Sequence, residues 1–352
     1  MPSGTSHNAV DASSAQRCTG AQTPHVSRVR DEFHALTSTC GVFDLSNRAK
    51  IAITGNDRVR WLNGMVTNNI RDLQPGNGVY SFLLNPQGHI LGDFFTYHLG
   101  DRIVVDTDNS QVDKILATFD HYIIMDDVEL VKVSDQIACV GIAGPGAKHA
   151  LAMAGLEVSE LTSLQVQDVT WKQSEGRVVA GEHEQYPSYE IWIAPERTAE
   201  VMQTVQSAGA MPISREAFDI YRVALGIPRY GQDIRERDLP QETEQQRALN
   251  FNKGCYIGQE IVERIRSRGN VHRKFTGLRV AGSPPVLGAR ILSAGKDVGE
   301  VTSSALVPTA NGDFAVALGY IRREVGIPGK EVQIEASSAT VSDLPFSDLF
   351  NR

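Results

Sequence analysis

The sequence predicts an α+β protein that ends in a small β-barrel. Over residues 41–225, short apolar runs and tight turns alternate with helical stretches, in hairpins rather than in repeated βαβ units. Over residues 273–346 the chain holds only short β-type runs, separated by turns such as Asn311-Gly312-Asp313. The 352 residues, 41% hydrophobic and 22% charged, suit a folded soluble protein of two or three domains.

The first part of the fold is predicted to hold five strands and two helices. Asn56-Asp57 offers a cap to the first helix, and the residues from Asn85 to Gly88 form a hairpin turn. The expected strands cover residues 41–45, 50–55, 79–84, 89–99 and 103–106, and the expected helices begin at residues 58 and 111.

A second α/β segment follows from about residue 128. Its expected strands are 137–142, 177–180 and 189–193, and its expected helices are 148–154, 197–208 and 214–225. The Gly144-Pro145-Gly146 turn superficially suggests phosphate binding, but it lacks the GxGxxG spacing and the Lys-Ser/Thr pair, so a tight strand-to-helix turn is the better interpretation. The expected barrel strands are 276–280, 289–293, 298–303, 314–320 and 331–336.

Composition narrows the class of protein. With 34 basic and 42 acidic residues, the net charge of −8 argues against general nucleic-acid binding. No apolar run approaches the roughly 20 residues of a membrane span. Residues 1–27, rich in Ser, Thr and Ala, are expected to form a flexible tail without a secretory signal. Because no two of Cys18, Cys40, Cys139 and Cys255 form a CxxC pair, we expect neither a zinc site nor an iron–sulfur cluster. Four cysteines in so long a chain do not make a disulfide scaffold, which fits a reducing cytoplasm.

The octapeptide 253–260, Lys-Gly-Cys-Tyr-Ile-Gly-Gln-Glu, is the most informative motif. Cys255 precedes a predicted helix start, where unpaired N–H groups, together with the nearby Lys253, favour a thiolate. The alternative is a small buried cysteine in a glycine-rich turn. Residues 253–274 carry six basic and two acidic side chains, a local charge of +4, which suits an anionic ligand or simply a solvated helix face.

Four further residues are candidates for ligand binding, and three of them have a structural alternative. Asp93 could bind a ligand amine from its strand or lie on the exposed face of that strand. Glu190, an acid among aromatic residues, could accept paired hydrogen bonds from an amino-heterocycle or face water. Arg222 could recognise a heterocycle or a carboxylate, or simply cap the last carbonyls of its helix. Tyr230, the fourth candidate, lies at the other end of the loop that begins after Arg222.

These residues resemble a known family. The octapeptide resembles the signature of the YgfZ-type folate-binding proteins, and Leu225-Gly226-Ile227-Pro228, Leu239-Pro240-Gln241-Glu242 and Gly269-Asn270-Val271 fall in the expected order around it. Upstream, Phe43-Asp44-Leu45-Ser46, Leu84-Asn85 with Gly88, and Ile142 with Gly144-Pro145 resemble the wider family that includes the glycine-cleavage T-protein. The resemblance covers roughly residues 30 to 340.

The resemblance implies a three-domain ring of the aminomethyltransferase folate-binding type. The expected ranges are a tail at 1–27, an α/β folate-binding domain at 28–127, a second α/β domain at 128–212, a segment at 213–272 that returns to the first domain, and the barrel with its tail at 273–352. Tetrahydrofolate is the implied cofactor. The residues expected to bind it are Glu190, Arg222, Asp93, Tyr230, Gln259 and Glu260, and those expected to be catalytic are Cys255, facing the pocket, Lys253 and Asp93.

The resemblance also implies a role in the assembly or repair of iron–sulfur clusters of 4Fe–4S enzymes, including tRNA-modifying enzymes. Iron–sulfur enzymes or assembly proteins would then be transient partners, with neither membrane nor direct nucleic-acid contact. T-proteins tend to carry two adjacent aspartates, of which the first is Gly92 here, and they lack the cysteine octapeptide. The alternative function is a tetrahydrofolate-dependent aminomethyltransferase, in which Asp93 orients the folate and Cys255 is structural.

Overall fold

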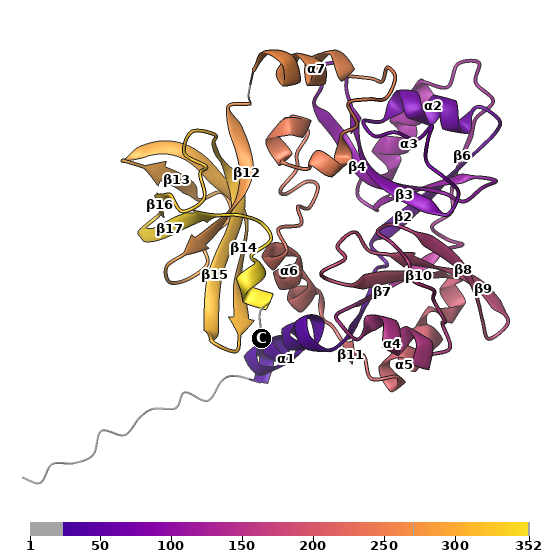
Figure 1. The fold of residues 1–352 in the computed structure, drawn as a ribbon, viewed down its shortest axis with the longest axis horizontal. Helices are drawn as coiled ribbons and strands as arrows, with labels where there is room; N and C mark the ends of the chain where they lie inside the picture. The colour runs from indigo at the N-terminus through magenta and orange to yellow at the C-terminus, as the bar shows by residue number, and fades with distance from the viewer. Residues whose placement is uncertain (1–23, 270, 351–352) are drawn as a thin grey trace, which may run out of the picture.

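The computed structural model describes residues 24–269 and 271–350. Two α/β layers and a closed barrel surround a central region, with the barrel on the left of Figure 1 and the two sheets on the right. This arrangement confirms the predicted α+β class and the C-terminal barrel. Cys18 and Asn270, which the sequence analysis singled out, lie outside the described residues.

The first sheet has the strand order β3-β4-β5-β2-β6. Gly88, with φ of +79°, closes the hairpin between β3 and β4, as the sequence predicts. Helices α2 and α3 cover one face through a core that includes Trp61, Phe94 and Phe119, and the other face points to the centre of the molecule. The elements are β2 (Arg48–Thr54), α2 (Arg58–Met65), β3 (Asn77–Leu84), β4 (Ile90–His98), β5 (Ile103–Asp108), α3 (Val112–His121) and β6 (Glu129–Lys132).

The second sheet has the order β11-β1-β7-β10-β9-β8. Its outer face packs on α4 and α5 through a core that includes Val140, Leu151 and Val201. Gly144, with φ of +120°, makes the tight turn that leads from β7 toward α4. The elements are β1 (Gly41–Asp44), β7 (Ala138–Ala143), α4 (Ala147–Met153), β8 (Val166–Trp171), β9 (Ser174–Ala180), β10 (Ser188–Ile193), η1 (Pro195–Arg197), α5 (Thr198–Ser207) and β11 (Met211–Pro212).

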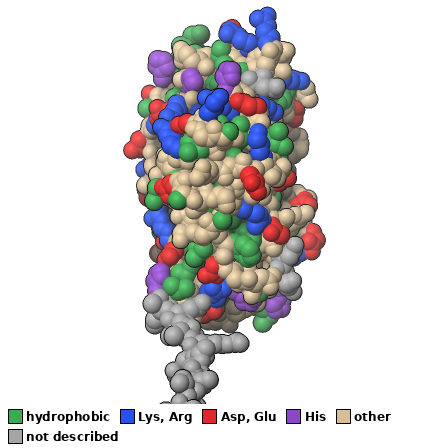
Figure 2. Space-filling view, turned by 90° about the vertical axis from the view of Figure 1, so that its left-hand side faces the viewer, with side chains coloured by type: hydrophobic (Ala, Val, Ile, Leu, Met, Phe, Trp, Pro, Cys, Tyr) green, Lys and Arg blue, Asp and Glu red, His purple; other side chains and the backbone are tan. Residues whose placement is uncertain are grey.

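The barrel closes in the order β12-β15-β14-β13-β16-β17 around an apolar core. The run predicted as 331–336 ends as β16 at Ile334, where a two-residue turn with Glu335 at φ of +52° leads into β17, a strand that was not predicted. On the face drawn in Figure 2, basic and acidic side chains are interspersed. The strands are β12 (Arg273–Val280), β13 (Arg290–Ser293), β14 (Lys296–Thr309), β15 (Gly312–Arg322), β16 (Glu331–Ile334) and β17 (Ser337–Ser342).

Two helices and one long segment join the barrel to the sheets. Helix α1 (Pro24–Ser38) packs on α6 (Arg215–Ala224), which also contacts β14. The Ser214 side chain caps α6 and itself donates to Glu32 of α1. The segment after α6 carries η2 (Pro240–Thr243), η3 (Gln246–Ala248) and α7 (Gln259–Arg268), and it packs on β3 and β4. The chain ends with η4 (Ser347–Phe350).

Three expectations about organisation need correction. Helix α1 begins at Pro24, so residues 24–27 are helical and not part of a tail. Strand β1, expected in the first domain, pairs with β7 and β11 of the second sheet, and β6, expected in the second, pairs with β2 of the first. Strand pairing joins segments far apart in sequence, which a division by residue number does not capture.

Among the described residues, no helix is long and apolar enough to cross a membrane.

Candidate functional site

A cavity of about 280 Å³ lies between the two sheets, α6 and the loop after it. Asp93, Glu190, Arg222 and Tyr230, which the sequence brought forward separately, all line it. Flat aromatic surfaces that enclose a few polar groups suit a planar heterocyclic ligand. The aromatic residues of the wall are Phe43, Tyr80, Phe95, Tyr97, Tyr186, Tyr189, Phe218, Tyr221 and Tyr230.

At one side of the cavity, Asp93 of β4 is held by two donors. The Tyr80 hydroxyl donates to Asp93 Oδ2 at 2.5 Å, and Gln111 Nε2 donates to Oδ1 at 2.8 Å. Burial raises the pKa of Tyr80 well above its ordinary value, so the phenol keeps the proton that it donates. The guanidinium of Arg247 lies over the Tyr80 ring, 4.6 Å from its centre, and helps to hold the ring in place. The carboxylate of Asp93 therefore has a defined orientation at the cavity wall.

Gly92, which stands where T-proteins tend to carry another aspartate, faces away from the cavity. Side chains alternate along a strand, so positions 92 and 93 point to opposite faces of the sheet. A Cβ at Gly92 would lie 3.2 Å from Gln111 Oε1 and 3.2 Å from Ile115 Cγ1 in α3. That Gln111 oxygen accepts the backbone N–H of Asp93 at 3.0 Å. The absent acid thus removes no group from the cavity wall.

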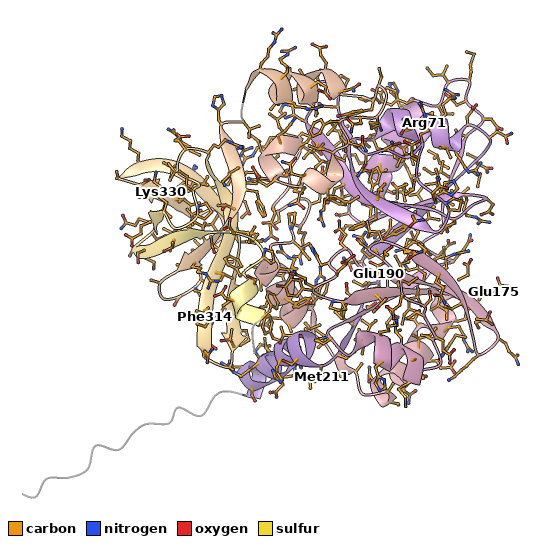
Figure 3. All side chains as sticks on the ribbon, in the orientation of Figure 1. Arg71, Glu175, Glu190, Met211, Phe314 and Lys330 are labelled. Carbon is orange, nitrogen blue, oxygen red and sulfur yellow. The ribbon has the colours of Figure 1, made fainter. Side chains whose placement is uncertain are left out.

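On the second sheet, Glu190 of β10 presents its carboxylate to the cavity. Figure 3 shows it at the centre of the molecule. Trp192 Nε1 donates to Glu190 Oε2 at 2.9 Å, and the Cys139 thiol donates to the same oxygen at 3.2 Å. The side chain is 24% exposed, and Oε1 has no hydrogen bond within the described part of the chain. One oxygen is therefore fixed by the protein and the other is available to a ligand.

A buried ion pair from the first sheet supports Glu190. Lys50 Nζ lies 2.8 Å from Asp106 Oδ1, 4.0 Å from Glu190 Oε2 and 4.6 Å from the centre of the Trp192 ring. Although burial favours the neutral amine, Asp106 raises the pKa of Lys50. Burial likewise opposes ionisation of Asp106, but Arg48 and Lys50 lower its pKa. Two cations thus face two carboxylates at the junction of the sheets.

Arg222 lines the cavity, but its donors are directed into the protein. Its side chain is buried, and it donates to Asp219 at 2.5 Å, to Asp233 at 2.8 Å, to Ser303 at 3.0 Å and to the Ile227 carbonyl at 3.2 Å. Four of the five N–H groups of a guanidinium are thereby used. This side chain joins α6 to the barrel. For its predicted role in binding a heterocycle, only one N–H group remains available to a ligand.

Tyr230 is fixed in a similar way. Its hydroxyl donates to the Leu91 carbonyl at 2.6 Å and accepts a hydrogen bond from Lys114 at 2.7 Å. Lys114 also pairs with Glu236 at 2.6 Å. The ring forms part of the cavity wall, while the polar end of the side chain ties the loop after α6 to the first sheet.

The cysteine octapeptide does not line the cavity, which corrects the expectation for Lys253, Cys255, Gln259 and Glu260. Lys253 Nζ donates to the carbonyls of Asn63, Val66 and Asn68, each at 2.6 Å, at the C-terminal end of α2. Burial, with a smaller effect of Arg71, lowers its pKa to about 7, whereas the three carbonyl oxygens favour its protonated form. Lys253 is a structural clamp that the motif alone does not reveal.

Cys255 is exposed and lies in the irregular stretch before α7. Helix α7 begins at Gln259, four positions later, so the thiol is not at the helix start that the sequence suggests. This stretch lies near Arg71: a Cβ at Gly254 would be 4.0 Å from that guanidinium. Figure 3 shows Arg71 at the far side of the first sheet from Glu190. Glu260 is 83% exposed and pairs with Arg264.

Sequence reasoning missed several residues that complete the site. Tyr80 could have been found by counting pairs back from the hairpin turn, because β3 pairs Phe82 with Asp93 and puts Tyr80 on the same face. No local sequence pattern pointed to Gln111, Trp192 or Cys139. Gln111 lies just before α3, and its hydrogen bond to Asp93 is not visible in the sequence. Trp192 on β10 and Cys139 on β7 become neighbours only because these two strands pair.

Comparisons with known proteins agree with this architecture. A model of the GCVT N-terminal domain matches residues 11–253, and one of the glycine cleavage T-protein C-terminal barrel domain matches residues 273–348. The chain belongs to the glycine-cleavage T-protein superfamily. It is 28% identical over 337 residues to a Nostoc sp. protein curated as Aminomethyltransferase, covering 91% of this chain and 88% of that one.

Other relatives give the same picture. A Thermus thermophilus protein, also curated as Aminomethyltransferase, is 29% identical over 326 residues, 91% of this chain and 90% of that one. The fold matches the crystal structure of the glycine cleavage system aminomethyltransferase T from Bartonella henselae with a TM-score of 0.81 at 23% identity, covering 91% and 90% of the two chains. This likeness confirms the expected fold.

The comparisons overturn the main functional expectation. The relatives are curated as aminomethyltransferases, and nothing among them connects the chain to iron–sulfur clusters, to tRNA modification or to iron–sulfur partners. That expectation rested on the octapeptide, whereas the similarity extends over most of the chain. The expected cofactor is confirmed at the level of the family, whose members use tetrahydrofolate as the one-carbon carrier.

Proposed function

We propose that this protein is a tetrahydrofolate-dependent one-carbon transferase of the aminomethyltransferase type. The observation that carries the proposal is the pair of carboxylates, Asp93 and Glu190, which face one aromatic cavity from different sheets. Relatives curated as aminomethyltransferases over most of this chain support the same function.

The cavity fits the chemistry of a reduced folate. A pterin is a flat ring that carries amino and ring N–H donors, and Glu190 Oε1 is a free carboxylate acceptor in an aromatic surrounding. When bound, tetrahydrofolate supplies the nitrogens that accept the one-carbon unit. Glu190 would hold the pterin, and Asp93, fixed by Tyr80 and Gln111, would orient the folate and act as the acid–base group near the reacting nitrogens.

The other cavity residues would support the site indirectly. In this proposal Arg222 keeps the wall formed by α6 attached to the barrel, and Tyr230 keeps the following loop attached to the first sheet. The glycine cleavage H protein, the known partner in this family, would be the aminomethylated donor. The transfer would yield methylenetetrahydrofolate, ammonia and the free thiol of the carrier.

Two measurements test the proposal. Anaerobic titration calorimetry with tetrahydrofolate should detect binding, and incubation with aminomethylated H protein should produce methylenetetrahydrofolate. Asp93→Ala should lower the transfer rate by about 10²- to 10⁴-fold, the usual contribution of a positioned acid–base group. Asp101→Ala, at an exposed position outside the cavity, is the matched control. Folate binding without any transfer, or equal rates for both variants, would contradict the proposed chemistry.

We also propose that the chain falls in the YgfZ-type branch of the superfamily, on the strength of the octapeptide 253–260 and of Gly92. This placement concerns descent and not a separate activity. A phylogeny that grouped the chain with T-proteins that lack the octapeptide would overturn it.

A further inference from the structure

Three side chains of the second sheet share the face that looks into the cavity. In the antiparallel pairing of β7 with β10, Cys139 lies directly opposite Trp192, so both point to the same side. Glu190 is two residues before Trp192 on β10 and therefore faces the same way. Strand register alone thus places a thiol and an indole next to the carboxylate that faces the cavity.

Both groups hydrogen-bond the same oxygen of Glu190. The Trp192 indole lies 2.9 Å and the Cys139 sulfur 3.2 Å from Oε2, which leaves Oε1 without a hydrogen bond in the described chain. The two donors come from different strands, so they fix the position of the carboxylate and the rotation of its plane. A carboxylate held in this way loses little freedom when a ligand binds.

The surroundings keep the thiol protonated and place a cation beside the carboxylate. Burial, followed by the charge of Glu190, raises the pKa of the Cys139 thiol well above its ordinary value, so the sulfur carries the proton that it donates. Lys50, Asp106 and Arg48 are the charged groups that face it from the first sheet. Lys50 offers positive charge to Glu190 at 4.0 Å without occupying Oε1.

We propose that Cys139 and Trp192 are positioning residues, which hold Glu190 Oε2 so that Oε1 accepts a hydrogen bond from the amino-heterocycle of the ligand. The inference rests on the proposed function, because it assigns the pterin to Glu190. Neither side chain needs to touch the ligand. Cys139 acts through hydrogen bonding by its S–H group, and its chemical reactivity plays no part.

The test measures the dissociation constant of tetrahydrofolate by anaerobic calorimetry for four variants. Trp192→Phe removes a donor to a charged group and should raise Kd by ~10-fold, and Cys139→Ala, which removes a weaker donor, should raise it by ~5-fold. Cys139→Ser restores an O–H donor and should bring Kd within ~2-fold of the natural protein. Cys40→Ala is the matched control, because Cys40 is also buried but belongs to the apolar core under α4 and α5.

The outcomes separate the inference from the function on which it rests. If the natural protein does not bind tetrahydrofolate, the proposed function fails. If it binds, and Cys139→Ser is as weak as Cys139→Ala, the thiol matters only for packing and the positioning role is refuted. An equal effect of Cys40→Ala would refute it as well. Rescue by serine with an inert Cys40→Ala supports it, and thermal melts verify that each variant is folded.

Discussion

Replacement of Arg222 by methionine separates a structural role from a ligand-binding role. The side chain is buried, and its partner Asp233 is fully buried. Methionine keeps much of the apolar length but removes the charge and the four hydrogen bonds. Asp233 would retain the Arg229 backbone N–H and the hydroxyls of Thr302 and Ser303, but no buried cation would compensate its charge.

The magnitude follows from the cost of leaving a buried charge unpaired. Removing one partner of a buried ion pair typically costs about 3–5 kcal/mol, a large share of a total stability of about 5–15 kcal/mol. Arg229→Met is the matched control, because Arg229 is 37% exposed and its side chain pairs with Asp219 at the surface. Exposed pairs contribute less than about 1 kcal/mol, so this variant should be nearly as stable as the natural protein.

Urea unfolding of the two variants, followed by tetrahydrofolate titration below the transition, gives both quantities. Arg222→Met should lose about 3–5 kcal/mol of unfolding free energy, and its remaining folded fraction should still bind folate. The reasoning is refuted if Arg222→Met is within about 1 kcal/mol of the natural protein and yet loses folate affinity by more than ~50-fold. That result would return Arg222 to the ligand, as the sequence resemblance implied.

Three further predictions concern the octapeptide. Gly258→Ala should destabilise the protein by about 2–4 kcal/mol in urea unfolding, because φ is +79° and a Cβ would lie 2.6 Å from the Asn85 carbonyl oxygen. Gly254→Ala should be nearly neutral, because the nearest atom to a Cβ there is 4.0 Å away, and equal effects of the two substitutions would contradict the packing argument. The pKa of Lys253 is lowered to about 7, while the unfolded chain keeps this proton to about pH 10.4, so unfolding free energy should rise from pH 7 to 9, by at most about 1.4 kcal/mol per pH unit. Lys253→Met should lose this rise, and an unchanged slope would refute the assignment. Cys255→Ser should keep folate affinity and transfer rate within ~2-fold, since Cys255 is outside the cavity; a large loss in a calorimetric or transfer assay would place the thiol in the reaction.

Much of the local structure could be predicted from the sequence. The hairpin between β3 and β4 follows from the Asn85–Gly88 turn, and its register puts Tyr80 and Asp93 on one face. The barrel strands follow from the turn residues that separate them, apart from β17, which follows the turn at Glu335 and was not predicted. These features depend on neighbours in the chain, where turn chemistry and side-chain alternation decide the outcome.

The candidate site was predictable only in part. Asp93 and Glu190 were found as acids in apolar strands, and the structure brings both to one cavity. Arg222 was also found, but its partners Asp233 and Ser303 lie in a loop and in a barrel strand that no local pattern links to α6. The octapeptide was the most distinctive motif and led to the iron–sulfur function that the comparisons overturn, because distinctiveness in sequence does not give position in space.

By itself, the sequence determined the α+β class and the C-terminal barrel and, through its resemblance, the T-protein superfamily and the tetrahydrofolate cofactor of that superfamily. Tertiary structure decided which side chains meet. It turned Lys253 into a clamp on α2, left Cys255 outside the cavity and gave one oxygen of Glu190 two donors from distant strands. The physical reason is the range of the interactions. Turns and strands form from adjacent residues, whereas hydrogen bonds and ion pairs in a buried site depend on pairings that only the folded chain creates.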